Sequence, residues 1–536
     1  MSKRYQVVIV GGGPVGMGLA IELGQRGVSC LVIERRVGSH IVPKGQNLTS
    51  RTLEHFYYWG VVDQMRAARI MPKEVPSSGV TGYKSLMSEH WFAIDGREMT
   101  NAYYFQANDR LPQYDTERVL RERMESLSNV DVRWGWSARS VTQDNDGVRI
   151  TIAKDGAKDG ARDNNGETEV IEADYAVGCD GGHSLVREQI GIERGGNDYD
   201  QLMLLAVFRS RELHELFGKR FPVRSTYRVL TPEWKRYWLF FGRIDVGEGW
   251  FFHTPIPNDV DRKTFDAHAV IEKTVGTSFK AEYDHIGYWD MRVAVAERYQ
   301  VGRVFIAGDA AHSHPPYGGY GVNNGLEDVT NLGWKLAARL QGWGSDALLA
   351  SYSEERRPVF KETADDFIEG RTKIEADVLE NFSPEKDLVA FKAAWDGLSK
   401  DGNARIGAYA PHYSGSPVVL GPPGAKCSAH GEHTFVAKAG HHLPPQKLSS
   451  GRNVFEELGD GFALLAFDAD QAAVSGFEAA ARELSVPLKV IRDSLGGGRE
   501  AYGARLVLVR PDQYVVWCGD VTPMPPHAVL ARAVGR

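Results

Sequence analysis

The beginning of the chain alternates apolar runs with a glycine turn and an amphipathic stretch. Residues 7–10 form a continuous β-branched run, which is typical of a strand buried on both faces of a parallel sheet. A helical pattern follows at residues 17–26, and residues 31–34 form a second apolar run. This order of strand, turn, helix and strand predicts a βαβ unit and therefore an α/β fold.

The pattern changes in the middle of the chain. Runs of alternating aromatic and aliphatic residues at 203–208, 237–243 and 249–256 predict an antiparallel sheet. Helical periodicity then starts at residue 326 and continues to near residue 398. Closer to the C-terminus, short apolar runs on both sides of a helical segment at 471–484 predict a further compact α/β unit.

Composition narrows the class of protein. The 536 residues exceed what one hydrophobic core usually serves, so we expect several domains. No apolar stretch approaches the roughly 20 residues that a membrane span needs. The net charge of −7 gives no basic surface for nucleic acid. We therefore expect neither a nucleic acid nor a membrane as a partner.

The cysteines and the N-terminus indicate the compartment. Cys30, Cys179, Cys427 and Cys518 lack the spacing of a redox pair or of a metal site. Scattered thiols of this kind suit a reducing cytosol. The first apolar run starts at residue 5, which leaves no room for a signal peptide. We expect a cytoplasmic protein without a metal site.

The turn after the first strand carries the strongest chemical signal. Gly11, Gly13 and Gly16 match G-x-G-x-x-G, with Pro14 and Val15 inside the motif. In such a turn the first glycine permits the tight bend and the second lets the backbone approach a pyrophosphate. The third lets the following helix pack on the strand, and the N-terminus of that helix favours the phosphate charge. The motif predicts a dinucleotide site.

The end of the second strand supports this prediction. Glu34 lies 18 positions after Gly16 (34 − 16), close to the spacing expected for a carboxylate that binds ribose hydroxyls. Arg35 follows it directly and is included in the predicted site. A carboxylate here would repel the 2′-phosphate of NADP, so the stretch favours FAD or NAD.

Three segments, residues 11–34, 178–187 and 308–331, together resemble the flavin-dependent aromatic hydroxylases of the para-hydroxybenzoate hydroxylase type. The similarity is greatest to the phenol hydroxylase-like branch, whose members carry a C-terminal thioredoxin-like domain. The resemblance covers nearly the whole chain. It implies an α/β fold class with a Rossmann-type FAD-binding domain, an inserted antiparallel β-sheet substrate domain and a C-terminal thioredoxin-like α/β domain.

The resemblance also implies limits for these domains. The FAD-binding domain would be discontinuous and would comprise residues 1–75, 108–190 and 285–400. Residues 76–107 and 191–284 would form the substrate-binding sheet domain. The thioredoxin-like domain would comprise residues 407–536.

Family members further imply which residues contact FAD. Asp309 of the Gly308-Asp309 pair would bond a ribityl hydroxyl. A glycine turn that opens a helix supplies N–H donors and a positive dipole end, which suit the pyrimidine edge of a reduced flavin. The residues implied at that edge are Gly321, Val322 and Asn323. The other implied contacts are Lys44, Gln113, Val141, Asp180, Arg187, Pro316 and Gly319, and Pro316 and Gly318 would line the reactive face of the flavin.

The implied reaction has two halves. NADH or NADPH reduces FAD, and the reduced flavin takes up O2 to form a C4a-hydroperoxide that hydroxylates a small phenolic or catechol-like ring. The protein must exclude water, hold the ring and assist the loss of the phenolic proton. The choice between NADH and NADPH has no readable motif. A homodimer is a candidate assembly state.

The substrate side departs from the family pattern. Gln46 stands where some phenol hydroxylases carry an ionisable residue, and a glutamine cannot accept a proton. Either Gln46 only orients the substrate, or proton removal passes to another group. Tyr227, His253 and Tyr317 are the candidates for that group.

Two alternative functions stay open. The same fold could serve a tailoring hydroxylase that acts on a polyketide, an antibiotic or another polycyclic aromatic. A flavin oxidase or reductase without oxygen insertion is the other alternative. The bulky residues within 202–256 favour a small ring, and residues 309–331 with their Pro315-Pro316 pair favour oxygen chemistry.

Overall fold

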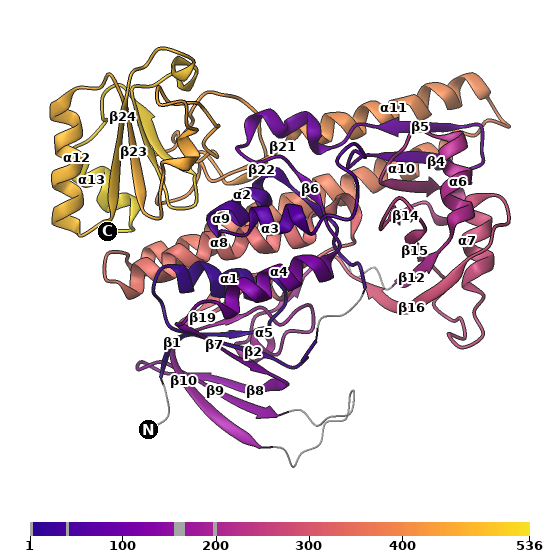
Figure 1. Cartoon of the computed structure of the whole chain (residues 1–536), viewed down its shortest axis with the longest axis horizontal. Helices are drawn as coiled ribbons and strands as arrows, with labels where there is room; N and C mark the ends of the chain where they lie inside the picture. Colours follow the sequence, from indigo (N-terminus) through magenta and orange to yellow (C-terminus); the bar gives the residue numbers. More distant parts are fainter. Residues whose placement is uncertain (1–3, 39–41, 155–166, 197–200) are drawn as a thin grey trace.

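The computed structural model describes residues 4–38, 42–154, 167–196 and 201–536. Figure 1 shows a parallel sheet at the bottom, long helices across the centre, a second sheet on the right and a separate C-terminal unit on the left. The sequence predicts an exposed hairpin loop at residues 154–168, and most of that segment lies outside the described residues.

The parallel sheet forms the centre of the N-terminal part. β1 (Tyr5–Val10) lies between β10 (Thr168–Gly178) and β2 (Cys30–Glu34), with β19 (Val304–Ile306) and β7 (Val130–Trp134) next on either side. These strands are parallel to one another. The C-terminal end of β1 therefore opens at the edge where open α/β sheets bind their ligands.

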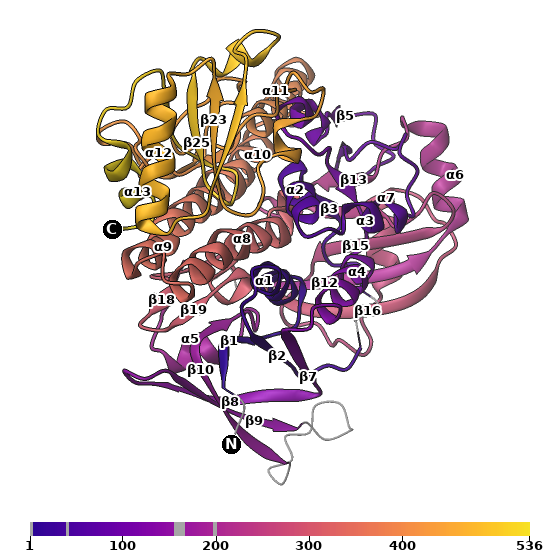
Figure 2. The ribbon, with the colours of Figure 1, turned by 60° about the vertical axis from the view of Figure 1, so that its left-hand side comes forward.

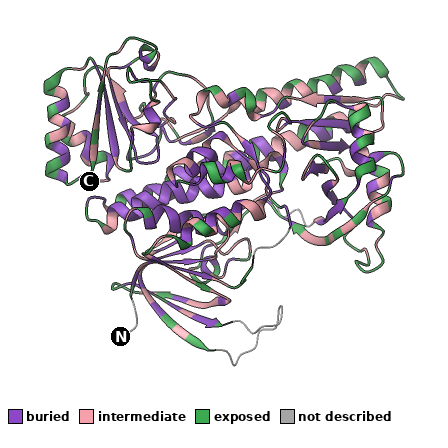
Figure 3. Cartoon of the chain, in the orientation of Figure 1, coloured by how far each residue is buried: buried purple, intermediate pink, exposed green. Residues whose placement is uncertain are grey.

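Three helices lie over this sheet. α1 (Pro14–Gln25) contacts both α4 (Gln113–Glu125) and the long helix α8 (Gly321–Leu340). α9 (Asp346–Glu362) runs beside α8, which is buried along most of its length (Figures 2 and 3). The prediction that this helix starts at residue 326 was wrong by five residues (326 − 321). Glycine and asparagine in the first turn have low helix propensity, and tertiary contacts override it.

A seven-stranded mixed sheet forms the right-hand part of the molecule (Figure 1). Its order is β16 (Glu282–Met291), β12 (Gln201–Arg209), β15 (Gly249–Pro255), β14 (Leu239–Arg243), β13 (Thr226–Leu230), β4 (Gly79–Tyr83) and β5 (Trp91–Ile94). All neighbours are antiparallel except β13 and β4, which are parallel. α6 (Arg211–Arg220) and α7 (Ala267–Val275) pack on one face, which we call the outer face. The opposite face is the inner face.

The C-terminal unit is a four-stranded sheet covered by two helices. Its strand order is β24 (Leu488–Asp493), β23 (Phe462–Phe467), β25 (Leu506–Val509) and β26 (Val515–Gly519). The helices are α12 (Gln471–Leu484) and α13 (Pro526–Ala533), which pack on the same apolar cluster. The predicted fold class of a Rossmann-type domain, an inserted sheet and a C-terminal α/β unit is confirmed. Within the described residues, no helix combines the length and the apolar character that crossing a bilayer requires.

Candidate active site

The turn between β1 and α1 leaves space where a phosphate needs it. A Cβ on Gly11, whose φ is +109°, would lie 2.3 Å from the carbonyl oxygen of Cys179. A Cβ on Gly16 would lie 1.9 Å from the carbonyl oxygen of Gly11, so Gly16 allows α1 to pack on the turn. A Cβ on Gly13 would meet no atom within 4 Å. Gly11 and Gly16 therefore serve packing, whereas Gly13 faces open space.

Glu34 forms one wall of a cleft in front of this turn. Its carboxylate accepts the N–H of Gly12 at 2.7 Å and that of Arg36 at 2.8 Å. Gly12, Gly13, Glu34, Arg36 and Trp134 line the cleft together. An ionised carboxylate can accept about four hydrogen bonds, so Glu34 retains lone pairs for ribose hydroxyls.

The turn at Gly308 meets the first turn of α1. A Cβ on Gly308, whose φ is +60°, would lie 3.0 Å from the side chain of Val15. A Cβ on Gly325 would lie 2.6 Å from the same valine. Val15 therefore packs against both the Gly308 turn and α8, and three segments that are distant in the sequence meet at one point.

Asp309 is exposed, although the residues on both sides of it are buried. Its side chain is open to solvent, and it has no hydrogen-bond partner among the described residues. The surrounding protein raises the pKa of Asp309, although the charges of His312, Lys44 and Arg194 oppose the shift. Burial and the charge of Arg36 lower the pKa of Lys44, whereas the negative charge of Asp309 raises it. Lys44 and Asp309 are therefore close enough for their charges to interact.

Helix α8 directs unpaired donors toward this region. No side chain caps its N-terminus. The N–H groups of its first turn, at Gly321, Val322 and Asn323, have no acceptor within the helix. A Cβ on Gly45 would lie 3.2 Å from Val322 and 3.4 Å from Oε1 of Gln113. The free N–H groups and the helix dipole favour an electron-rich ligand edge at this place.

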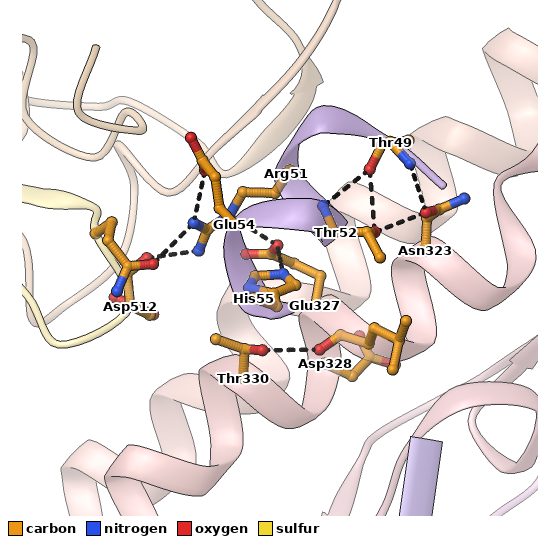
Figure 4. A network of polar contacts seen from close by, with 12 residues as sticks. Thr49, Arg51, Thr52, Glu54, His55, Asn323, Glu327, Asp328, Thr330 and Asp512 are labelled. Carbon is orange, nitrogen blue, oxygen red and sulfur yellow. Dashed lines mark hydrogen bonds and ion pairs between the residues drawn. The ribbon is translucent and has the colours of Figure 1, made fainter. Parts of the chain in front are cut away.

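The side chain of Asn323 is fully used within the protein. Its Oδ1 accepts the N–H of Thr49 at 3.0 Å and the hydroxyl of Thr52 at 2.6 Å (Figure 4). Its Nδ2 donates to the carbonyl oxygens of Asn47 at 2.8 Å and Gly319 at 2.7 Å. Only the backbone of Asn323 is therefore available to a ligand.

One turn further along α8, Glu327 anchors the helix to α2 (Ser50–Tyr58). Its carboxylate contacts His55 at 2.8 Å and Arg51 at 3.1 Å (Figure 4). Burial favours the neutral acid, but Arg51 and His55 hold the pKa of Glu327 well below its usual range. The start of α8 is thus fixed by a buried ionic contact.

Asp328 fixes the turn that carries Asp309. It accepts the N–H of Gly308 at 3.0 Å, and it contacts His312 at 2.6 Å and Arg356 at 2.7 Å. Asp328 and Arg356 are not among the site residues predicted from the sequence. Asp328 lies within the stretch that carries the family resemblance, but Arg356 is on another helix and no local pattern marks it.

Asp180 and Arg187 hold two loops together. Asp180 accepts the hydroxyl of Ser184 at 2.5 Å, and burial raises its pKa. Arg187 donates to the carbonyl oxygens of Gly182 and Ala310, both at 3.1 Å. Because Ala310 follows Asp309 directly, the Arg187 side chain joins the Asp180 loop to the Asp309 turn.

Three other residues that the sequence predicts as cofactor contacts are placed in different ways. Gln113 accepts the N–H of Gly45 at 3.1 Å and donates to Glu117 at 2.7 Å. Arg35 is exposed beside Glu34. Val141 is buried in β8 (Trp136–Gln143), apart from the residues that line the Glu34 cleft.

The inner face of the mixed sheet lies against the loop that leads to Gln46. Leu205, Val207 and Phe251 of this face pack on Val42. The same loop continues to Gly45, which is next to Val322 of α8. The loop therefore joins the inner face to the cofactor side of the site.

Two of the substrate-side candidates are buried polar groups without protein partners. His253 is 6% exposed, and neither ring nitrogen has a hydrogen-bond partner among the described residues. It lies on the inner face because it is two positions from Phe251 on β15. Burial lowers its pKa to about 4, so its imidazole is neutral near pH 7. Gln46 is 5% exposed, and both of its amide atoms are likewise unpartnered.

The other two substrate-side candidates are placed differently. Tyr227 lies on the outer face, where its ring packs 4.5 Å from that of Phe217 and its hydroxyl accepts from Arg243 at 3.1 Å. Tyr317 stacks on Trp238 at 4.3 Å and accepts the N–H of Trp238 at 3.0 Å. We withdraw Tyr227 as a candidate base because strand alternation points it away from the inner face. Tyr317 packs the 316–319 loop against Trp238, the residue before β14.

The donors and acceptors of this cleft fit FAD. Open space at Gly13 and the start of α1 suit the pyrophosphate, and Glu34 suits the adenosine ribose. Asp309 is an unpartnered acceptor for a ribityl hydroxyl. The first turn of α8 offers N–H groups to the ring system.

Two family profiles match the chain. The family described as "FAD binding domain" matches residues 4–366, and "Aromatic-ring hydroxylase, C-terminal" matches residues 437–536. The 4-methyl-5-nitrocatechol 5-monooxygenase of a Burkholderia species is 29% identical, with 98% of this chain and 96% of that protein covered. The rifampicin monooxygenase of Streptomyces venezuelae is also 29% identical, with 96% of each chain covered. The crystal structure of a ternary complex of aklavinone-11 hydroxylase with FAD and aklavinone has a TM-score of 0.78 at 27% identity, with 100% of both chains covered.

Proposed function

Because the chain belongs to the FAD-dependent aromatic-ring monooxygenases, we propose that it hydroxylates a small phenolic ring with O2, using NADH or NADPH as the electron donor. Bound FAD would supply the redox and oxygen chemistry. The residues of this chain bind the cofactor, orient the ring and exclude water.

One observation carries this proposal. The Gly13 turn, the Asp309 turn and the uncapped N-terminus of α8 are distant in the sequence, yet they meet around Val15. In our proposal Gly13 and α1 receive the pyrophosphate, Glu34 the ribose, and Asp309 the ribityl chain. Lys44 would contribute positive charge near the phosphates. The exposed Pro316 and its neighbours Gly318 and Gly319 would border the reactive face of the flavin.

A single-ring substrate suits the inner face. Leu205, Val207 and Phe251 are already buried against Val42, so little apolar surface remains for a large ligand. The relative that acts on 4-methyl-5-nitrocatechol supports this choice. The relatives that act on rifampicin and aklavinone keep a polycyclic or other natural product as the second candidate.

His253 and Gln46 are the polar groups that we assign to the substrate. A neutral imidazole can both donate and accept a hydrogen bond, so His253 can contact the ring hydroxyl, and its lowered pKa suits a hydrogen-bond partner rather than a base. The Gln46 amide can orient the ring but cannot take up a proton. Both side chains would gain partners that they lack within the protein.

The remaining proposals concern the chain as a whole. The observed sheets support the domain limits 1–75, 108–190 and 285–400 for the FAD side, 76–107 and 191–284 for the substrate side, and 407–536 for the C-terminal unit. The cysteine pattern supports a reducing cytoplasm. We retain the homodimer as a proposal to be checked by light scattering.

The proposal is tested with the purified holoprotein. A panel of phenols, catechols and larger polycyclic rings is screened for stimulation of NADH and NADPH oxidation, with isotopically labelled O2 and mass spectrometry of the products. Incorporation of one labelled oxygen into a single-ring product is expected. Coenzyme oxidation that never yields a labelled product would instead identify an oxidase or reductase.

A further inference from the structure

Arg110 is a buried cation for which the described residues provide no anionic partner. It lies on β6 (Asp109–Arg110), which pairs with β3 (Asn47–Leu48), and it is 3% exposed. Nη1 donates to Oδ1 of Asn47 at 2.9 Å, and Nη2 donates to the carbonyl oxygen of Arg243 at 3.0 Å. Nε has no partner among the described residues. The adjacent acid, Asp109, is engaged by Arg69 at 2.8 Å.

Three other buried arginines in this protein have a carboxylate beside them, whereas Arg243, whose carbonyl oxygen accepts from Arg110, has only neutral partners among the described residues. Arg228 contacts Glu375 at 2.8 Å. Arg356 contacts Asp328 at 2.7 Å, and Arg510 contacts Glu355 at 2.7 Å. A buried charge that faces only neutral oxygens is costly, because the lost hydration is not replaced by an opposite charge. The position of Arg110 therefore calls for an anion from outside the chain.

The guanidinium lies where the cofactor loop and the inner face meet. A Cβ on Gly319, in the loop beside the reactive face of the flavin, would lie 3.3 Å from Cβ of Asn47, the partner of Arg110. A Cβ on Gly242 would lie 3.0 Å from Nη2 of Arg110 and 2.0 Å from the ring of Phe251. Arg110 is thus next to the Phe251 ring of the inner face and one residue away from the cofactor loop.

We propose that Arg110 binds the anionic oxygen of the substrate ring, so that the ring is held as a phenolate. This inference rests on the proposed function and names the residue of this chain that would position the ionised ring. A phenolate carries more electron density in its ring than the neutral phenol, which suits attack by an electrophilic oxygen. A ring that binds already ionised also needs no strong base, which agrees with Gln46 at the position where some relatives have an ionisable residue.

The electrostatics of Arg110 agree with this role. Burial and the charge of Arg69 lower its pKa to about 9, and no carboxylate opposes the shift. The group is still a cation near pH 7. An anion that enters the site would remove the electrostatic cost of that charge.

Binding to the FAD-loaded protein tests the proposal with two matched probes. 4-Nitrophenol is used at a pH above its own pKa, and 4-nitroanisole is its neutral counterpart. We expect wild type to bind the phenolate at least about tenfold more tightly by calorimetry, as a charge-assisted hydrogen bond allows. Arg110→Gln is expected to lose this preference, whereas Arg110→Lys keeps part of it. Benzoate serves as a third probe, and an Arg110-dependent preference for benzoate alone would reassign the site to carboxylates and overturn the phenolate.

Arg228→Gln is the matched control, since Arg228 is also buried in this region but has Glu375 as its partner. It should keep the phenolate preference and lose more in Tm than Arg110→Gln, because it leaves a carboxylate buried with less positive charge. The proposal is overturned if wild type does not prefer the phenolate, if Arg110→Gln retains the preference, or if Arg110→Gln lowers Tm as much as the control. Failure of the hydroxylase proposal is seen separately, as the absence of any ring-stimulated NADH or NADPH oxidation in wild type.

Discussion

Asp309 and Glu34 are both carboxylates that we assign to the cofactor, but their contacts within the protein differ. Glu34 accepts two backbone N–H groups, whereas Asp309 has no hydrogen-bond partner among the described residues. A side chain without protein partners contributes little to folding and is free for a ligand. Its removal should therefore affect FAD binding more than stability.

Asp309→Ala is expected to weaken FAD binding about tenfold or more, which corresponds to the loss of one hydrogen bond to an ionised group. The Tm of the apoprotein should stay within a few degrees of wild type. Flavin absorbance per protein after gel filtration and an FAD titration measure the effect. Asp174→Ala, at an exposed pair with Arg4, is the control. Full flavin content in Asp309→Ala would contradict the assignment of Asp309 to the cofactor.

His253 makes stability depend on pH. Its pKa is lowered from 6.5 to about 4 in the folded protein, so the unfolded chain binds the proton more readily. Stability should therefore fall as the pH drops from about 6.5 toward 4, by up to about 3 kcal/mol from this group. Denaturant unfolding at pH 7 and pH 5 should show a smaller loss for His253→Phe than for wild type. An identical loss in the two proteins would argue against a buried neutral His253.

At the scale of elements, the glycines of the turn between β1 and α1 have two different roles. Some allow close packing, and one leaves space that we assign to the cofactor. Gly16 is needed because a Cβ would lie 1.9 Å from the carbonyl oxygen of Gly11, whereas Gly13 has open space around it. The spacing of the glycines predicts the turn, and its environment explains why each glycine is there. Other boundaries were less predictable: α8 begins at Gly321 because contacts of Asn323 and Glu327 with α2 hold its weak first turn.

Two substitutions in this turn should have different effects. Gly16→Ala is expected to lower the free energy of unfolding by at least about 2 kcal/mol through overpacking. Gly13→Ala should fold normally but bind FAD less tightly, because its methyl group would occupy the open space that we assign to the pyrophosphate. Gly397→Ala, in the open environment of α11 (Leu388–Ala408), is the control and should be neutral or stabilising. Normal flavin content in Gly13→Ala would contradict the placement of the pyrophosphate.

At the scale of the whole molecule, buried ion pairs join the C-terminal unit to the central helices. Arg510, after β25, contacts Glu355 of α9 at 2.7 Å and Asp512 at 2.5 Å. Although burial favours the neutral acid, Arg510 and Lys335 hold the pKa of Glu355 far below its usual range. Charged side chains therefore hold the C-terminal unit against α9. Removing one of them would leave a buried charge unpaired, which lowers the stability of the folded protein.

Arg510→Met is expected to destabilise the protein by about 3–5 kcal/mol, since it leaves buried carboxylates with less positive charge. Calorimetric unfolding should show a lower Tm. Arg492→Met is the control because its pair with Glu478 is exposed, with side chains 49% and 33% accessible, and should cost less than about 1 kcal/mol. Equal Tm values for the two variants would show that the interface does not depend on this network.

The amino-acid sequence alone determined the βαβ start, the aromatic sheet, the C-terminal α/β unit and the FAD-type turn, because residue periodicity and glycine spacing are local properties of the chain. Only the tertiary structure decided that His253 lies on the inner face and Tyr227 on the outer one, since that depends on which helices cover the sheet. It alone revealed Arg110 as a buried cation that has no carboxylate partner in the described part of the chain, because a side chain's partners come from segments that the sequence order does not place beside it.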